Sequence, residues 1–129
     1  MAKLELMKTI ETGPDANRLY LNPGNSRYGL FANEAGKSDI VSIIDTQLDV
    51  KVKDIWTGLG PHNVAFDPDG KFAVISTKKE NVATLVVDTG SADPNDWDVI
   101  TTDLDSGIQN NGVRWVPSPA ALKKALAQN

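Results

Sequence analysis

The chain of 129 residues contains no cysteine and only one histidine. The missing cysteine excludes disulfides, thiolate nucleophiles, thiolate-metal sites and haem attached through paired cysteines. A single imidazole cannot supply the several protein ligands that a metal centre needs. The sequence therefore predicts neither a resident metal nor a cofactor.

Long apolar runs are also missing. No stretch approaches the ~18 apolar residues of a membrane span, and residues 1–6, MAKLEL, alternate charged with apolar residues instead of forming a signal core. We expect no membrane span and no signal peptide. The compartment stays open, because a signal removed earlier would leave the same start.

Basic charge is scarce. There are 13 Lys and Arg residues against 17 Asp and Glu, giving a net charge of -4 and a pI near 4.8. Such a surface repels a phosphate backbone, so nucleic acid is excluded as a partner. With 40% hydrophobic and 23% charged residues, the composition is that of a globular domain, and we expect one domain over 1–129.

The units described next lack helical periodicity, and the sequence contains an internal repeat. The segment GPHNVAFDPDG from Gly60 has an earlier counterpart, GPDANRLYLNPG from Gly13, and a later one from Gly107. Prolines 23, 68 and 117 of these segments lie 45 and 49 residues apart. A unit of about 40 to 50 residues is the length of a four-stranded propeller blade.

Within each unit, short apolar runs separated by turn residues predict strands. The segment Asp67-Pro68-Asp69-Gly70 predicts a hairpin turn, because its last residue is a glycine, which accepts positive φ. Alternation over 4–10 predicts the outer strand of a preceding blade, and Ser118-Pro119 predicts the start of a short helix over 119–128. The expected strands are 17–22, 28–33, 39–45, 50–57, 63–67, 72–77, 82–88 and 97–103.

The third and fourth strands of each unit differ in pattern. The third strands, 39–45 and 82–88, are apolar nearly throughout, as expected for strands covered on both faces. The fourth strands alternate, as expected where one face meets water. Large rings are expected to pack between the sheets; these are Trp56, Phe66, Trp97 and Trp115.

The segment 60–76, together with 81–88, resembles the YVTN repeat: glycine-proline, an apolar strand, a proline-aspartate-glycine turn, a second strand, and a third strand ending in aspartate-threonine. The first unit is looser but ends in Ile44-Asp45-Thr46, and the third keeps only its first strand. The resemblance implies an all-β fold of β-propeller-like blades, each of four antiparallel strands. The blade units are 13–57 and 60–103, with a partial third unit at 107–117.

Closed propellers usually contain about four to eight blades. Two and a half blades leave sheet faces uncovered, so we expect self-association or a larger protein complex. Many propellers of this type are periplasmic or extracellular, which the resemblance implies for this chain without fixing its location.

Polar residues near the first strands are the candidate ligand site, because these strands surround the channel of a propeller. Arginine and amide side chains there suit a small polar or anionic ligand. Two alternatives stay open: a hydrogen bond within the loop for the histidine, and pairing with a nearby carboxylate for the arginines. The candidates are His62, Asn63, Arg18, Asn17, Arg114 and Asn111.

Carboxylates on loops are a weaker signal. Asp67, Asp69, Asp93, Asp96 and Asp98 offer oxygen ligands for calcium, but their spacing is that of turn formers. No serine-nucleophile or phosphate-loop motif is present. We expect a non-enzymatic binding or scaffold protein; the alternative is a fragment or accessory subunit of a redox or lactonase-like propeller enzyme with a shared central-channel site.

Overall fold

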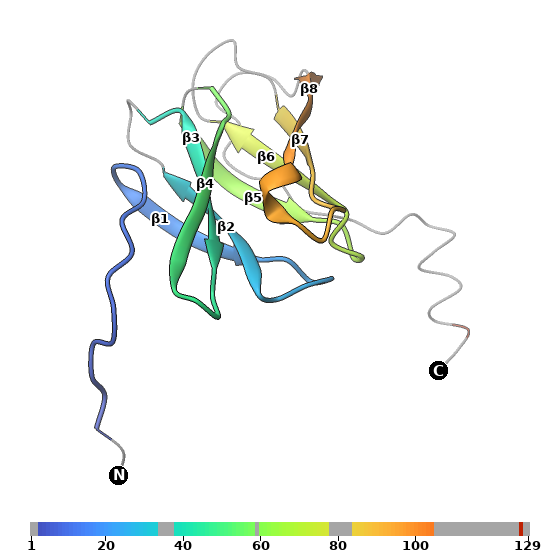
Figure 1. Cartoon of the computed structure of the whole chain (residues 1–129). Helices are drawn as coiled ribbons and strands as arrows, with labels where there is room; N and C mark the ends of the chain where they lie inside the picture. Colours follow the sequence, from blue (N-terminus) through green and yellow to red (C-terminus); the bar gives the residue numbers. More distant parts are fainter. Residues whose placement is uncertain (1–2, 34–37, 59, 78–83, 105–126, 128–129) are drawn as a thin grey trace.

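A computed structural model describes residues 3–33, 38–58, 60–77, 84–104 and 127. Within these ranges the fold is all-β, with two antiparallel sheets of four strands each (Figure 1). In both sheets the strands follow one another in chain order. The first sheet has the order β1-β2-β3-β4 and the second the order β5-β6-β7-β8.

The eight strands lie within a few residues of the predicted ranges. The first sheet contains β1 (Ala16–Leu21), β2 (Tyr28–Asn33), β3 (Ile40–Asp45) and β4 (Val50–Trp56). The second contains β5 (Pro61–Phe66), β6 (Phe72–Thr77), β7 (Thr84–Asp88) and β8 (Asp98–Leu104). Within the described ranges, one 3-10 turn, η1 (Pro94–Asp96), lies in the loop before β8.

The predicted turn between β5 and β6 is confirmed. The amide of Gly70 donates to the carbonyl of Asp67, and the Asp67 carboxylate accepts the amide of Phe72 at 2.9 Å. Gly70 has a φ of 69°, a conformation that glycine adopts without steric cost. The aspartate and the glycine therefore act as turn formers.

The two sheets pack face to face, and their apolar side chains form one core. Alternation along each strand directs every second residue of the first sheet toward the second sheet. Tyr28 meets Trp97 edge-on, with ring centroids 6.0 Å apart. The buried members of the core are Leu30, Val41, Ile43, Ile55, Val64, Ala73, Ile75, Leu85, Val87 and Trp97.

Burial follows the predicted layers. β3 and β7 are mostly buried, while β4 is mostly exposed or half-buried. Trp97 is 1% exposed, which confirms its predicted packing role, and Phe66 packs against the core. The prediction for Trp56 is wrong: the ring is 65% exposed, and its Nε1 donates to the Asp39 carboxylate at 3.1 Å. Trp56 follows the core residue Ile55 in β4, so the alternation of the strand directs its ring to the other face of the sheet.

The predicted strand over 4–10 does not form. Residues 3–12 have no strand structure and extend away from both sheets (Figure 1). Leu4 is 97% and Leu6 86% exposed. A strand needs a neighbouring edge for its backbone hydrogen bonds, and this segment lies against neither sheet. The partial third unit at 107–117 lies outside the described residues, as does the helix predicted for 119–128 except at Ala127.

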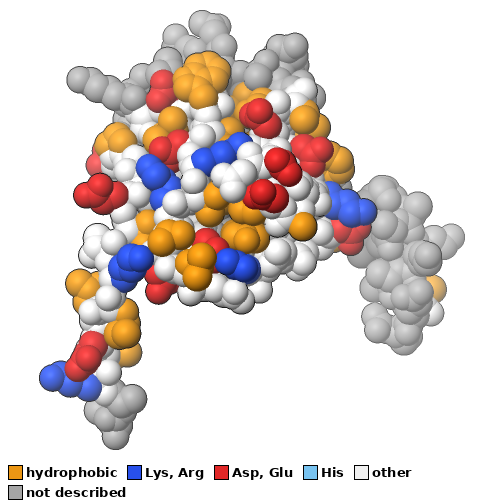
Figure 2. Space-filling view, viewed as in Figure 1, with side chains coloured by type: hydrophobic (Ala, Val, Ile, Leu, Met, Phe, Trp, Pro, Cys, Tyr) orange, Lys and Arg blue, Asp and Glu red, His pale blue; other side chains and the backbone are white. Residues whose placement is uncertain are grey.

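The visible surface mixes charges of both signs with apolar side chains (Figure 2). No extended basic region is seen on that face, in keeping with the net charge of -4. In the described part of the chain, no helix has the length and apolar character needed to cross a membrane.

Candidate ligand site at the first strands of the two sheets

The first strands, β1 and β5, carry the predicted ligand residues and contact each other between the sheets. The Tyr20 hydroxyl of β1 donates a hydrogen bond to Oδ1 of Asn63 on β5. Asn63 is half-buried, and its backbone amide donates to the Ser76 hydroxyl at 3.3 Å. The first bond joins the two sheets, and the second holds Asn63 within its own sheet.

Both first strands contain a bulge at the same place in the repeat. In β1, Ala16 and Arg18 pair with consecutive residues of β2, so Asn17 is the extra residue. In β5, Pro61 and Asn63 pair with Thr77 and Ser76, so His62 is the extra residue. A bulge bends the strand and redirects the side chain of the added residue, and bulges recur beside functional sites.

The structure thus gives the two predicted residues Asn17 and His62 equivalent positions. Asn17 is exposed and His62 half-buried. Arg18 follows its bulge, is exposed, and pairs with Ala32 across the sheet. The remaining two candidates, Arg114 and Asn111, lie outside the described residues.

The site offers hydrogen-bond donors and positive charge. Arg18 supplies a guanidinium, and the amide and imidazole groups of Asn17 and His62 can donate or accept. Tyr20 also belongs here, although the sequence reasoning did not name it. The sequence indicates it only through the phenol hydroxyl that Tyr20 places between Leu19 and Leu21, because such a hydroxyl needs a hydrogen-bond partner. Such a set suits recognition of a polar or anionic ligand.

Carboxylates do not gather into a metal site in the described ranges, where no group of three or more His, Cys, Asp or Glu residues lies close enough to hold an ion. Asp93 instead caps η1, with its side chain accepting the amide of Asn95 at 2.9 Å. Hydrogen bonds from the Asn95 backbone and side chain lower the pKa of Asp93. This carboxylate therefore acts in the turn.

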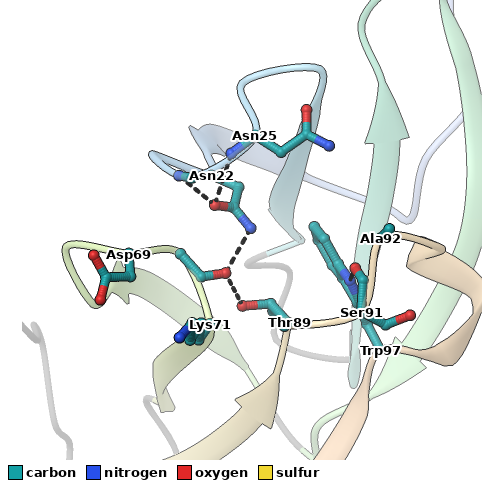
Figure 3. A pocket seen from close by; sticks show the side chains of 11 residues that line it. Asn22, Asn25, Asp69, Lys71, Thr89, Ser91, Ala92 and Trp97 are labelled. Atoms are coloured by element: carbon teal, nitrogen blue, oxygen red, sulfur yellow. Dashed lines mark hydrogen bonds between the residues drawn. The ribbon is translucent and has the colours of Figure 1, made fainter.

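A hollow of about 270 Å³ lies at the other end of the first strands, between the turns of the two sheets (Figure 3). Its polar groups bond mainly to one another. Asn22 Nδ2 donates to the Gly70 carbonyl at 2.8 Å, and Thr89 Oγ1 donates to the same oxygen at 2.7 Å. Ser91 donates to Asp96 at 2.9 Å. We therefore interpret this region as a structural contact between the turns of the two sheets.

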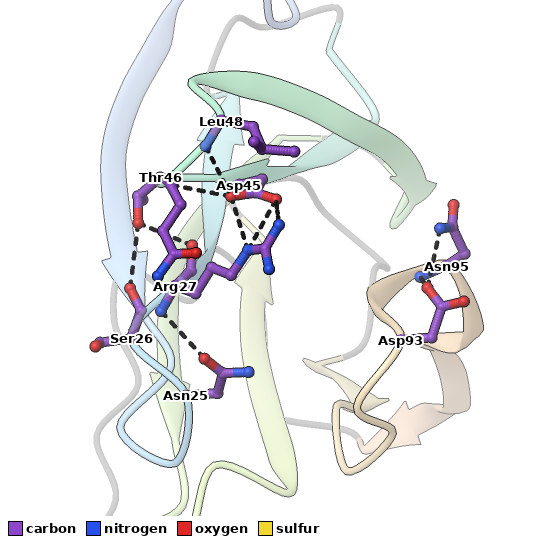
Figure 4. Close-up of polar contacts among 9 residues, drawn as sticks. Asn25, Ser26, Arg27, Asp45, Thr46, Leu48, Asp93 and Asn95 are labelled. Carbon is purple, nitrogen blue, oxygen red and sulfur yellow. Dashed lines mark hydrogen bonds and ion pairs between the residues drawn. The ribbon is translucent and has the colours of Figure 1, made fainter.

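An ion pair between the half-buried Arg27 and the buried Asp45 fixes the turns of the first sheet (Figure 4). Arg27 Nη2 lies 2.7 Å from Asp45 Oδ2, and the Asp45 side chain is only 4% exposed. Asp45 also accepts the amides of Gln47 and Leu48. The Arg27 hydrogen bond lowers the pKa of Asp45 from 3.8 to about 2, with a smaller contribution from these amides.

Comparison with known proteins gives a likeness of fold alone. No protein family matches the sequence, and no curated protein matches it. Among solved structures, the chain is similar to hydrazine synthase from Kuenenia stuttgartiensis, with a TM-score of 0.64 and 16% sequence identity. The likeness covers 93% of this chain and 31% of that one, so this chain spans less than a third of the length of its structural neighbour.

Proposed function

We propose that this chain is a non-enzymatic binding protein whose two sheets are YVTN-like blades of a larger β-propeller. Further blades, from a second copy or from another protein, complete the ring. Two features support the blades: each sheet is an antiparallel meander of four strands in chain order, and the two sheets share a core. The fold likeness to under a third of a longer chain fits the same proposal.

The ligand site of this proposal is the end of the first strands that carries the bulges. In a propeller the first strands line the central channel, so equivalent bulges turn side chains of successive blades toward one shared space. The observation that carries the proposal is the matched pair of bulges at Asn17 and His62. With Arg18 beside them, the proposed ligand is a small carboxylate anion.

Isothermal titration calorimetry with citrate tests this site. Binding is expected to weaken at least about tenfold in Arg18→Ala, which corresponds to a loss of about 1.4 kcal/mol. His62→Ala should also weaken binding. Lys71→Ala is the matched control, since it removes an exposed cation at the opposite end of the strands. The control should bind citrate as the unaltered chain does.

Absence of citrate binding, or an equal loss in Lys71→Ala, would overturn the proposed anion site. A bound metal detected by elemental analysis and lost in His62→Ala would instead favour the alternative of an accessory part of a redox or lactonase-like propeller enzyme.

A further inference from the structure

The outward face of the first sheet repeats the face that the second sheet turns into the core. The repeat makes Leu19 equivalent to Val64, and Leu21 equivalent to Phe66. Val64 is buried in the core and Phe66 packs against it. Leu19 and Leu21 lie together over Gly29, on the outward side, and are 40% and 50% exposed. Among the described residues, no second sheet lies against this apolar face of the first sheet.

The outward face of the second sheet is, in turn, equivalent to the face that the first sheet directs into the core. Leu30 pairs with Ile43 in the first sheet, and both are in the core. Their equivalents, Val74 and Val86, pair with each other in the second sheet and are half-buried on its outward side. Phe72, the equivalent of Tyr28, is 40% exposed there. This outward face therefore repeats the one that the first sheet uses inside the chain.

We infer that the outward face of the second sheet in one copy of this chain packs on the outward face of the first sheet in the next copy. The contact repeats the packing that already joins the two sheets within one chain. It is head-to-tail, since different faces meet, and a constant rotation between blades closes such contacts into a ring. This inference rests on the propeller proposal and names a second copy as the partner.

Interior packing of the chain supports this choice of partner. A sheet face packs well only on a face of complementary shape. The outward face of each sheet finds such a face on the outward side of the other sheet, in a second copy of the chain. Burial of Leu21 and Phe72 in the contact would remove apolar side chains from water, which is the main source of association free energy.

The test is light scattering on size-separated samples of the 129-residue chain. Leu21→Lys and Phe72→Lys each place an ammonium in the contact, so each is expected to raise the assembly midpoint concentration at least tenfold. Leu48→Lys is the control: Leu48 is 61% exposed but lies in the turn between β3 and β4, away from both faces. It should assemble as the unaltered chain does.

Mixing the two variants makes the test specific. A Leu21→Lys chain keeps its second-sheet face, and a Phe72→Lys chain keeps its first-sheet face, so the mixture should form a 1:1 complex while each alone is monomeric. Complex formation also demonstrates that both variants are folded.

Three results would overturn the inference: an unaltered chain that stays monomeric at about 100 µM, assembly that survives Phe72→Lys but not Leu21→Lys, and a mixture that stays monomeric. The second would indicate pairing of two identical first-sheet faces. Citrate binding measured on the same samples shows separately whether the proposed anion site holds.

Discussion

The side-chain amide of Asn22 donates a 2.8 Å hydrogen bond to the carbonyl of Gly70, and this bond joins the first hairpin turn of one sheet to that of the other. The same carbonyl accepts the Thr89 hydroxyl at 2.7 Å. Asn22 is 2% exposed, so these groups meet away from water. The Gly70 carbonyl oxygen thus joins three turns. Removing its hydrogen bonds should weaken the contact between the sheets.

Asn22→Asp should destabilise the chain by about 1–3 kcal/mol, because a carboxylate replaces the donor and faces the Gly70 carbonyl. Urea unfolding at pH 7 measures the change. Asn25→Asp in the same turn is the control: Asn25 is exposed, and its Oδ1 accepts the amide of Arg27, a role that a carboxylate keeps. Equal losses of unfolding free energy in the two variants would show that the Asn22–Gly70 hydrogen bond does not stabilise the contact between the sheets.

Gly70→Ala should cost about 2 kcal/mol or more. The residue has a φ of 69°, and an added Cβ would lie 1.7 Å from Oδ1 of Asn22. Gly90→Ala provides the comparison, since its Cβ would lie 3.3 Å from the nearest atom, Oδ1 of Asp88. Thermal unfolding of both variants should show the larger loss at Gly70; a smaller loss there would show that the turns are not in close contact.

Asp45→Asn should lower the free energy of unfolding at pH 7 by on the order of 1 to 2 kcal/mol. The pKa of Asp45 is about 2 in the fold and 3.8 without its partners. Because the folded pKa is the lower one, the carboxylate stabilises the fold above about pH 4, and this contribution is lost as the pH falls from 4 to 2.

Asp88→Asn is the matched control for that titration, since Asp88 ends β7 as Asp45 ends β3 but is exposed. Stability measured from pH 7 to pH 2 should depend on pH less steeply in Asp45→Asn than in Asp88→Asn. Identical profiles would show that the Arg27 pair does not stabilise the fold.

Trp97→Ala should destabilise the chain by about 3–5 kcal/mol, as expected for removal of a large buried ring. Trp97 is 1% exposed, whereas Trp56 is 65% exposed. Trp56→Ala should therefore change stability by less than about 1 kcal/mol. Denaturant unfolding of the two variants checks this difference, and a comparable loss at Trp56 would indicate that its ring is covered in the folded protein.

The strands could be predicted from sequence because each carries its own signal. Turn residues such as Asp67 and Gly70 bound the apolar runs, and the apolar pattern separates the buried β3 from the half-exposed β4. The repeat added the order of the strands, since each unit predicts four in succession. Strand limits and hairpins are local properties of the chain.

Contacts between the sheets could not be predicted in this way. Asn22 and Gly70 are 48 residues apart, and neither residue type indicates the other as a partner. The bulges at Asn17 and His62 depend on pairing with β2 and β6, which a single strand sequence does not encode. Trp56 was misassigned because an aromatic residue at a strand end has the same local pattern whether it is buried or exposed.

Native mass spectrometry of the 129-residue chain at about 10 to 50 µM tests most directly the claim that its two sheets are blades of a larger ring. The account predicts one oligomer of fixed copy number, with the apolar faces of both sheets covered. A monomer that binds no dye specific for exposed apolar surface would contradict it, because two sheets would then be sufficient as a closed fold.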